Sequence, residues 1–454
     1  MPQFSVWASK YRVRFHRLGL GPHKDDLDMV LRRFGIGYNT GTNLNSLRFV
    51  SLRDVMSSKT FFAAVAASVV SLSIILSAAA EQVDVDALSA ALRAVGPKGQ
   101  GHREASRAWR ALSKADADQL PAILAAMQGS GKLAENWFRA VVEAVAQHQL
   151  DSGGELPIKA LEKFLADTKQ LPRARRLAYE LIASVDKDAE SRLIPELLND
   201  PSLELRRDAV AVALIKAAAL ETAGQKEAAA AAYAKAFAAA RDLDQIKEAA
   251  TKLRSFKQPV NVPLHMGFVM HWYLIGPFDN TDKKGFDVAY PPEKEIDLTA
   301  TYQGKLGKVR WFEHTTTDEY GIVDLNASFH RPKDGNAYKL TPEHKGAIAY
   351  AVSTFVSDRE RDVDLRLGCI NANKVWLNGK LLTANQVYHA GMEVDQYLAP
   401  GHLKKGRNQI LVKICQNEQQ ESWAQRWQFQ LRVCDRIGTA VLAQNRPLNQ
   451  TASK

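Results

Sequence analysis

Acidic side chains in the second half of the chain are the residues whose type could support hydrolysis of a glycosidic bond. That reaction needs two carboxyl groups that face each other about 5 to 9.5 Å apart, and Glu293, Glu295, Asp318 and Glu319 are carboxyl residues of this region. Spacing in the sequence does not reveal such a pair, so these residues are candidates by type only, and solvated loop charges are the alternative. The sequence also contains neither a Gly-x-Ser-x-Gly nucleophile motif nor a Gly-x-x-x-x-Gly-Lys-Ser/Thr phosphate loop. We therefore expect no catalytic residue, and a hydrolase with an unrecognised site is an alternative.

Histidine and aspartate side chains could bind a metal ion in the same region. His265 and His271 are six residues apart, which would place them on one face of a strand, but the chain has no His-Glu-x-x-His or paired Cys-x-x-Cys motif. We expect no catalytic metal and no organic cofactor. Asp279 and Asp282 belong to a short polar turn whose oxygen atoms suit Ca²⁺. A structural calcium ion is one interpretation of this turn, and a simple turn is the other.

Aromatic residues within polar loops could instead bind a sugar. A sugar ring offers apolar C–H faces that stack on aromatic rings, and hydroxyls that form hydrogen bonds. Trp423 lies in a polar stretch between two expected strands, and Tyr388 and His389 lie in another loop, ahead of Asp395. The sequence predicts these four residues as ligand-binding. The alternative for Trp423 is packing in the core or at its rim.

The three cysteines lie on or beside expected strands, where cysteine behaves as a small buried apolar residue. A hairpin turning near residue 421 would set Cys415 opposite about residue 427, so a disulfide between Cys415 and Cys434 is disfavoured. A disulfide between Cys369 and one of these two stays open.

Length and charge exclude several classes of protein. The chain has 454 residues, 46% of them hydrophobic and 24% charged, which is an ordinary globular composition for about two or three domains. Of the net charge of +10, a share of +6 falls in residues 1–80, which hold ten Lys/Arg and four Asp/Glu. The remainder is nearly balanced, so we expect no nucleic-acid partner.

The apolar run Phe61–Leu76 predicts export. It follows Met56 and Lys59 and precedes the small pair Ala78 and Ala80, which together are typical of a secretory signal peptide with its cleavage site. We therefore assign residues 56–80 to the signal peptide. Residues 1–55 would then be a leader that arises from a start codon assigned too early, with Met56 as the true first residue. The protein is expected to be periplasmic or extracellular. A membrane anchor formed by residues 60–80, about the 20 residues that a spanning helix needs, is the alternative.

Residues 81–256 are rich in alanine, leucine and charged helix formers, which predicts a helical domain. Three segments align on Pro121, Pro157 and Pro195, which are 36 and 38 residues apart, and a proline suits the first turn of a helix. Residues 115–217 resemble HEAT-like helical repeats, with Asn199-Asp200-Pro201 as a turn between two helices, and residues 221–237 are similar to a tetratricopeptide helix pair. Stacked pairs of this kind form a short solenoid that commonly receives a protein partner.

Residues 257–262 form the expected linker, and residues 263–436 are expected to form a β-sandwich. Many short strands follow one another without intervening helices. Asn378-Gly379 between two of these strands predicts a tight type I′ hairpin. We expect residues 437–454 to be a flexible tail.

The stretch from Lys374 to Ile414 carries a second resemblance. Val375-Trp376-Leu377-Asn378-Gly379 and Leu403-Lys404-Lys405-Gly406, with Asn408 after it, resemble the jelly-roll sugar-binding domain of family 2 glycoside hydrolases, within the galactose-binding-like class. In those enzymes the domain is an accessory to a catalytic barrel, and the class often carries a structural calcium ion. No barrel of about 250 residues fits the rest of this chain. The resemblance therefore implies binding of carbohydrate without catalysis.

The sequence thus predicts a multidomain α plus β protein, with a short HEAT/TPR-like α-solenoid followed by an all-β jelly-roll sandwich. We expect an exported, non-catalytic binding or scaffolding protein whose partner is a polysaccharide or cell-surface glycan. The first alternative is a protein–protein assembly module that uses the solenoid.

Overall fold

The computed structural model describes residues 84–329 and 345–446. The chain divides into two units, and all the described residues belong to the second, Glu81–Lys454. The leader, the apolar run and the cleavage residues Ala78 and Ala80 all lie outside the described residues. Within the described part of the chain, no helix is long and apolar enough to cross a membrane.

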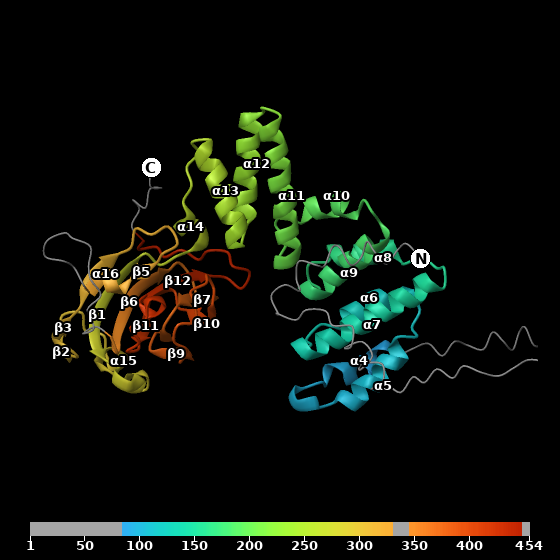
Figure 1. The fold of residues 1–454 in the computed structure, drawn as a ribbon. Helices are drawn as coiled ribbons and strands as arrows, with labels where there is room; N and C mark the ends of the chain where they lie inside the picture. The colour runs from blue at the N-terminus through green and yellow to red at the C-terminus, as the bar shows by residue number, and fades with distance from the viewer. Residues whose placement is uncertain (1–83, 330–344, 447–454) are drawn as a thin grey trace, which may run out of the picture. The chain divides into compact units, whose positions relative to one another are not determined.

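The first half of the second unit is helical, as predicted (Figure 1). Alanine, leucine and charged residues with high helix propensity dominate its sequence. Pro121 lies in the first turn of its helix, as expected, whereas Pro157 precedes a helix and Pro195 lies in a 3-10 turn. The helices are α4 (Val85–Arg93), α5 (His102–Leu112), α6 (Leu120–Ala125), α7 (Lys132–Asp151), α8 (Ile158–Ala166), α9 (Pro172–Val185), α10 (Ala189–Leu193), α11 (Leu203–Thr222), α12 (Lys226–Ala239) and α13 (Leu243–Ser255).

The turn at Asn199-Asp200-Pro201 is held by a buried ion pair. Arg175 of α9 donates two hydrogen bonds to the carboxylate of Asp200, at 2.7 and 2.6 Å. Asp200 also accepts from the backbone N–H of Ser202, at 2.7 Å, just before α11 begins. This pair therefore fixes where α11 starts relative to α9, since a buried charge is tolerated only when it is paired and hydrogen-bonded.

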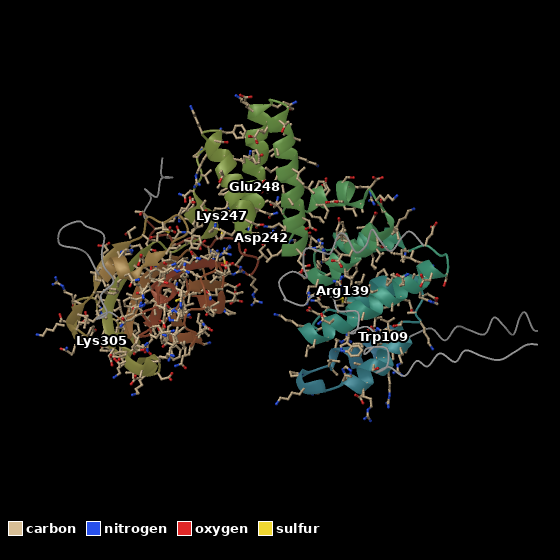
Figure 2. The ribbon with its side chains drawn as sticks, in the orientation of Figure 1. Trp109, Arg139, Asp242, Lys247, Glu248 and Lys305 are labelled. Atoms are coloured by element: carbon tan, nitrogen blue, oxygen red, sulfur yellow. The ribbon has the colours of Figure 1, made fainter. Side chains whose placement is uncertain are left out.

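A row of exposed ion pairs links four helices of this half. Arg139 (Figure 2) on α7 contacts Glu180 on α9 at 2.7 Å, Arg176 on α9 contacts Asp208 on α11, and Arg207 on α11 contacts Asp244 near the start of α13 at 2.5 Å. Exposed pairs of this kind stabilise little individually. The basic residues that recur in this half therefore form ion pairs between neighbouring helices.

The second half is a sandwich of two antiparallel sheets. The six-stranded sheet has the order β4-β1-β6-β11-β8-β9, and the four-stranded sheet has the order β10-β7-β12-β5 (Figure 1). The strands of the first are β1 (His271–Asp279), β4 (Phe312–Thr315), β6 (Ala347–Ser357), β8 (Ala372–Leu377), β9 (Lys380–Asn385) and β11 (Gly406–Gln416). Those of the second are β5 (Val323–Asp324), β7 (Arg361–Cys369), β10 (Tyr397–Leu403) and β12 (Gln428–Cys434), and β2 (Thr301–Gly304) pairs with β3 (Gly307–Arg310) apart from them. The helical domain followed by an all-β sandwich confirms the predicted fold class.

Period-2 alternation builds the core between the two sheets. Ile410, Val412 and Ile414 of β11 pack in one apolar cluster with Leu431 and Val433 of β12. Four of the five tryptophans in this half are buried, and the exposed one is Trp423. The predicted type I′ turn is confirmed, because Asn378 and Gly379 both have positive φ, 52° and 79°.

One predicted pairing is wrong. Strands β11 and β12 belong to different sheets, with β11 between β6 and β8 and β12 beside β7, so no hairpin joins them. Cys369, Cys415 and Cys434 are buried free thiols. Burial raises the pKa of Cys369 and Cys415 to about 12 and that of Cys434 to about 11, so all three stay protonated.

The segment after β12, expected to be a flexible tail, is hydrogen-bonded through Arg446, and residues 447–454 of that expected tail lie outside the described residues. Val441 donates to the carbonyl of Val433 at 2.9 Å, and Gln444 donates to the carbonyl of Val356 at 2.8 Å. The side chain of Asn445 also accepts from the N–H of Val356, at 3.0 Å. This segment therefore continues the sandwich along β6.

His265, expected on a strand with His271, lies instead in the short helix α14 (Val262–Met266). Its Nε2 lies 3.0 Å from the carbonyl oxygen of Ala240, and its ring lies 4.4 Å from that of Phe237. Burial, helped by the charges of the nearby Arg241 and Arg432, lowers the pKa of His265 to about 4, although the hydrogen bond to Ala240 acts in the opposite direction. The neutral ring therefore donates to Ala240 over the whole neutral range.

We expect this histidine to make the protein less stable in acid. Between its unfolded pKa of about 6.5 and its folded pKa of about 4, the unfolded chain binds a proton that the folded chain excludes. The free energy of unfolding therefore decreases as the pH is lowered through this window, by about 3 kcal/mol in all, and changes no further below it. Urea unfolding of the wild type and of His265→Gln at about pH 7 and about pH 5 measures the difference. Equal pH dependence in the two proteins would contradict this role.

Candidate functional site

One end of the six-stranded sheet gathers loops from distant parts of the sequence. Because neighbouring strands are antiparallel, β1, β11 and β9 end where β6 and β8 begin. Asn280 follows β1, Tyr388 and His389 follow β9, and Asn417 and Trp423 follow β11. We call these five residues the Trp423 cluster. It joins three of the four residues that the sequence predicts as ligand-binding.

Trp423 has an exposed indole on an anchored loop. Its relative exposure is 59%, and it is the one aromatic residue among the exposed large hydrophobic side chains of the described residues. The loop is held at the end of the 3-10 turn Ser422–Ala424, since Lys345 donates to the carbonyl of Ala424 at 2.9 Å and Asn326 donates to that of Gln425 at 2.8 Å. An exposed ring on a fastened loop offers a stacking face at little entropic cost.

His389 packs against the ring of Trp423. Its ring lies 5.1 Å from that of Trp423 at an angle of 87°, an edge-to-face contact. Its Nε2 lies 2.8 Å from Oδ1 of the buried Asn417, so this nitrogen donates to that oxygen. His389 adopts φ of 59°, an uncommon value for a residue other than glycine. Such backbone conformations persist where the surroundings fix them.

Tyr388, the residue before His389, contributes a hydroxyl to the Trp423 cluster. Its oxygen lies 3.2 Å from Nδ2 of Asn280, which also donates to the carbonyl of Gln416 at 2.9 Å. Burial raises the pKa of Tyr388 to about 12, so the hydroxyl keeps its proton at neutral pH and can donate it to a ligand oxygen. The ammonium of Lys283 lies 5.4 Å from the centre of the Tyr388 ring.

Buried amides lie at the same end of the sheet. Oδ1 of Asn280, both side-chain atoms of Gln416 and both of Asn371 are buried, and none of them forms a hydrogen bond with another described residue. Buried polar atoms are nearly always hydrogen-bonded. This end of the sandwich therefore has hydrogen-bonding capacity that the described protein groups do not use.

Asp395, the fourth predicted ligand residue, does not join the cluster. Its carboxylate accepts from Arg432, at 2.6 and 2.5 Å, and from Arg366, at 2.9 Å. Burial acts to raise the pKa of Asp395, but the two arginines outweigh it and hold the pKa below its ordinary value. Arg432 also donates to the carbonyls of Met266 and Gly438, both at 3.1 Å. Asp395 is thus part of a buried network that fastens α14 to the four-stranded sheet.

The two calcium-binding candidates are engaged by cations and by the turn itself. Asp279 accepts from the side chain of Thr281 at 2.6 Å and lies 3.6 Å from the ammonium of Lys305, and Asp282 pairs with Lys284 at 3.0 Å. Across the described residues, no group of three or more His, Cys, Asp or Glu side chains could hold a metal ion. The turn is accounted for by its own hydrogen bonds and ion pairs.

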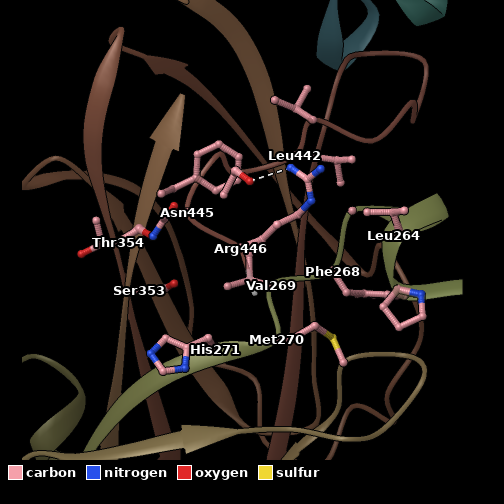
Figure 3. Close-up of a pocket in the computed structure, with 15 residues that line it drawn as sticks. Leu264, Phe268, Val269, Met270, His271, Ser353, Thr354, Leu442, Asn445 and Arg446 are labelled. Atoms are coloured by element: carbon pink, nitrogen blue, oxygen red, sulfur yellow. Dashed lines mark hydrogen bonds between the residues drawn. The ribbon is translucent and has the colours of Figure 1, made fainter. Parts of the chain in front are cut away.

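Two hollows lie elsewhere on the sandwich. The first, about 60 Å³, is formed where the segment after Val441 covers β6, with Phe268, Met270 and Arg446 in its wall (Figure 3). Ligand pockets usually have about 300 to 1,000 Å³, so this is a packing gap. The second, about 440 Å³, lies beside the β8–β9 turn and His402, and no Trp, Tyr or Phe lines it. Neither offers an aromatic stacking face like that of Trp423.

Sequence reasoning missed Asn280 and Asn417 as members of the cluster. Both directly follow a strand, and only the strand order brings them next to Tyr388 and His389. The available signal was a polar amide placed just after an apolar strand, at two separate points in the chain.

No protein-family model matches the chain, and no curated protein sequence matches it. Solved structures that resemble part of it include a β-glucosidase from Kluyveromyces marxianus, with 15% identity, 36% of this chain and 16% of that chain covered, and a TM-score of 0.21. An anti-sigma factor domain-containing protein has 13% identity, with 41% and 48% of the two chains covered and a TM-score of 0.22. A GH31 α-xylosidase from Xanthomonas citri has 10% identity, 37% and 16% coverage and a TM-score of 0.17. The chain spans only 16% of the length of that β-glucosidase, and TM-scores this low carry no argument about function.

Proposed function

We propose that the sandwich binds carbohydrate through the Trp423 cluster, in an exported protein that does not act on the bound glycan. The observation that carries this proposal is the exposed indole of Trp423 on a loop fastened by Lys345 and Asn326. The face of an exposed aromatic ring is apolar surface that a stacked sugar would remove from water.

The neighbouring groups suit the ligand that such a ring would take. A sugar ring stacked on Trp423 presents hydroxyls at its edge. The ring of His389 meets the indole edge to face, and the residue before it, Tyr388, has a hydroxyl 3.2 Å from Nδ2 of Asn280 as a polar group of the same cluster. The resemblance of residues 374–414 to the sugar-binding jelly-roll domain supports the same class of ligand. The ligand is therefore a polysaccharide or a cell-surface glycan.

Two carboxylates near this end of the six-stranded sheet have structural roles, which supports binding without catalysis by these two groups. Glu418 accepts from the backbone N–H of Asp282 at 2.6 Å. Glu293 accepts from the buried ammonium of Lys413 at 2.8 Å, and also from the hydroxyl of Tyr350. A hydrolytic carboxyl pair would have to be free to reach the sugar from two sides.

A pull-down on insoluble and soluble polysaccharides tests the proposal. The intact chain is expected to bind at least one of them saturably, Trp423→Ala to lose that binding, and Leu398→Ala to keep it. Leu398 is a matched control because it is 54% exposed on β10 and lies outside the cluster. Absence of binding across the panel, or equal binding by the Trp423 variant, would overturn the proposal.

A further inference from the structure

The helical half has a groove at the start of its stack. It lies between the segment that leads into α5 and the first turns of α7, and its volume is about 550 Å³, in the range of ligand pockets. The residues that line it are Val95, Gly96, Lys98, Gly99, His102, Leu133, Asn136, Trp137 and Ala140.

The floor of this groove is apolar and partly open. Leu133 is 48% exposed, and the partly buried ring of Trp137 lies 5.1 Å from that of His102, edge to face. An aliphatic side chain beside an aromatic ring is the kind of surface on which a large apolar anchor of a partner packs.

Positive charge lies in the groove and on the helix that begins at it. Lys98 lines the groove, and Arg103, Arg107 and Arg110 lie on the exposed side of α5, whose first residue, His102, also lines the groove. None of these four cations forms an ion pair with another described residue, and Glu104 is the single acidic residue between Lys98 and Arg110. In contrast, Arg139 and the other arginines of the ion-pair row on α7 to α11 are engaged. Unpaired charge of one sign beside an apolar hollow selects a partner of the opposite sign.

We propose that this groove binds an acidic peptide segment of a partner protein, with a large apolar side chain seated against Leu133 and Trp137 and its carboxylates facing Lys98 and the arginines of α5. A groove between two helices suits an extended or helical segment. An anionic membrane would instead be met by a broad apolar face with cations along it. This interaction is independent of the carbohydrate site, so either proposal can fail alone.

Selection from a random peptide library against the intact chain tests the inference. We expect the enriched peptides to combine net negative charge with a large apolar residue. The most enriched peptide should bind Leu133→Glu, and a double variant Arg103→Glu with Arg107→Glu, at least about tenfold more weakly than the wild type. Binding of the peptide should also weaken as the salt concentration is raised, because Lys98 and the arginines of α5 are exposed to solvent.

Matched variants control for stability and for net charge. Ile215→Glu places the same acidic residue on an aliphatic position of α11 that is 69% exposed, and the double variant Lys159→Glu with Lys163→Glu reverses two exposed charges on α8. Both should bind the selected peptide like the wild type, and circular dichroism should show every variant folded. Enriched peptides without acidic bias, or equal affinity for all variants, would overturn the inference. Loss of binding to phosphatidylglycerol vesicles in the same variants, without an acidic peptide, would assign the surface to a membrane and also overturn it.

Discussion

Asp395→Ala should lower the free energy of unfolding by about 3 to 5 kcal/mol, the cost typical of removing one partner from a buried ion pair. Arg432 and Arg366 are both buried, and Asp395 is the carboxylate that they share. Removing it leaves two buried guanidinium groups with fewer partners, and loosens the attachment of α14. Urea denaturation followed by circular dichroism measures the change.

The same carboxylate contributes to stability in a defined pH direction. Its pKa is lowered in the folded state, so its contribution is full above the unfolded pKa of about 3.9 and is lost as pH falls below that value. Asp358→Ala is the matched control. It removes an aspartate whose partner, Arg361, lies at the surface end of β7, and the expected cost is within about 1 kcal/mol. If Asp395→Ala changes stability little but greatly weakens glycan binding, Asp395 is a ligand-binding residue and the structural role proposed for it is wrong.

Trp423→Ala should weaken glycan binding by at least about thirtyfold, or about 2 kcal/mol, the loss expected when a central aromatic contact is removed. Trp423→Phe should keep part of the affinity, because a smaller ring still stacks. Stability should change by no more than about 0.5 kcal/mol, since the side chain is exposed. Isothermal titration with an oligosaccharide of the bound polysaccharide measures the affinity.

A different pattern would point to another role for the tryptophan. If Trp423→Ala unfolds the loop, the ring of His389 and the bond to Asn417 should be disturbed with it. Asn417→Leu keeps the approximate size of that side chain but removes the oxygen that accepts from His389, and tests this separately. Unchanged glycan affinity in Trp423→Ala, with full folding, would mean that the sugar site lies elsewhere.

The sequence predicts the fold class well because composition and periodicity are local properties. Alternation over residues such as Gln409 to Ile414 identifies a strand, and the Asn378-Gly379 pair identifies its turn. Strand order is not local. No local pattern near Cys415 or Cys434 indicates that β11 and β12 lie in opposite sheets. The predicted hairpin between these two strands is wrong for that reason.

The candidate site was predicted in part for the same reason. Trp423 is recognisable as an aromatic residue in a polar loop, and Tyr388 and His389 as polar aromatics in another. That these loops meet depends on the order β1-β6-β11-β8-β9. Asp395 shares a loop with Tyr388, yet its charge is taken by arginines of β7 and β12. The partners of a charged side chain are set by tertiary structure, so residue type alone could not separate these roles.

The central claim is that a sugar stacks on Trp423, and the indole N–H signals of the intact chain test it most directly. The chain has eight tryptophans, and the Trp423→Phe variant identifies the signal of Trp423 in a two-dimensional NMR spectrum. Addition of an oligosaccharide from the bound polysaccharide should shift that signal saturably and leave the indoles of buried Trp272 and Trp427 unmoved. A saturable shift of other indoles while that of Trp423 stays in place would contradict the account.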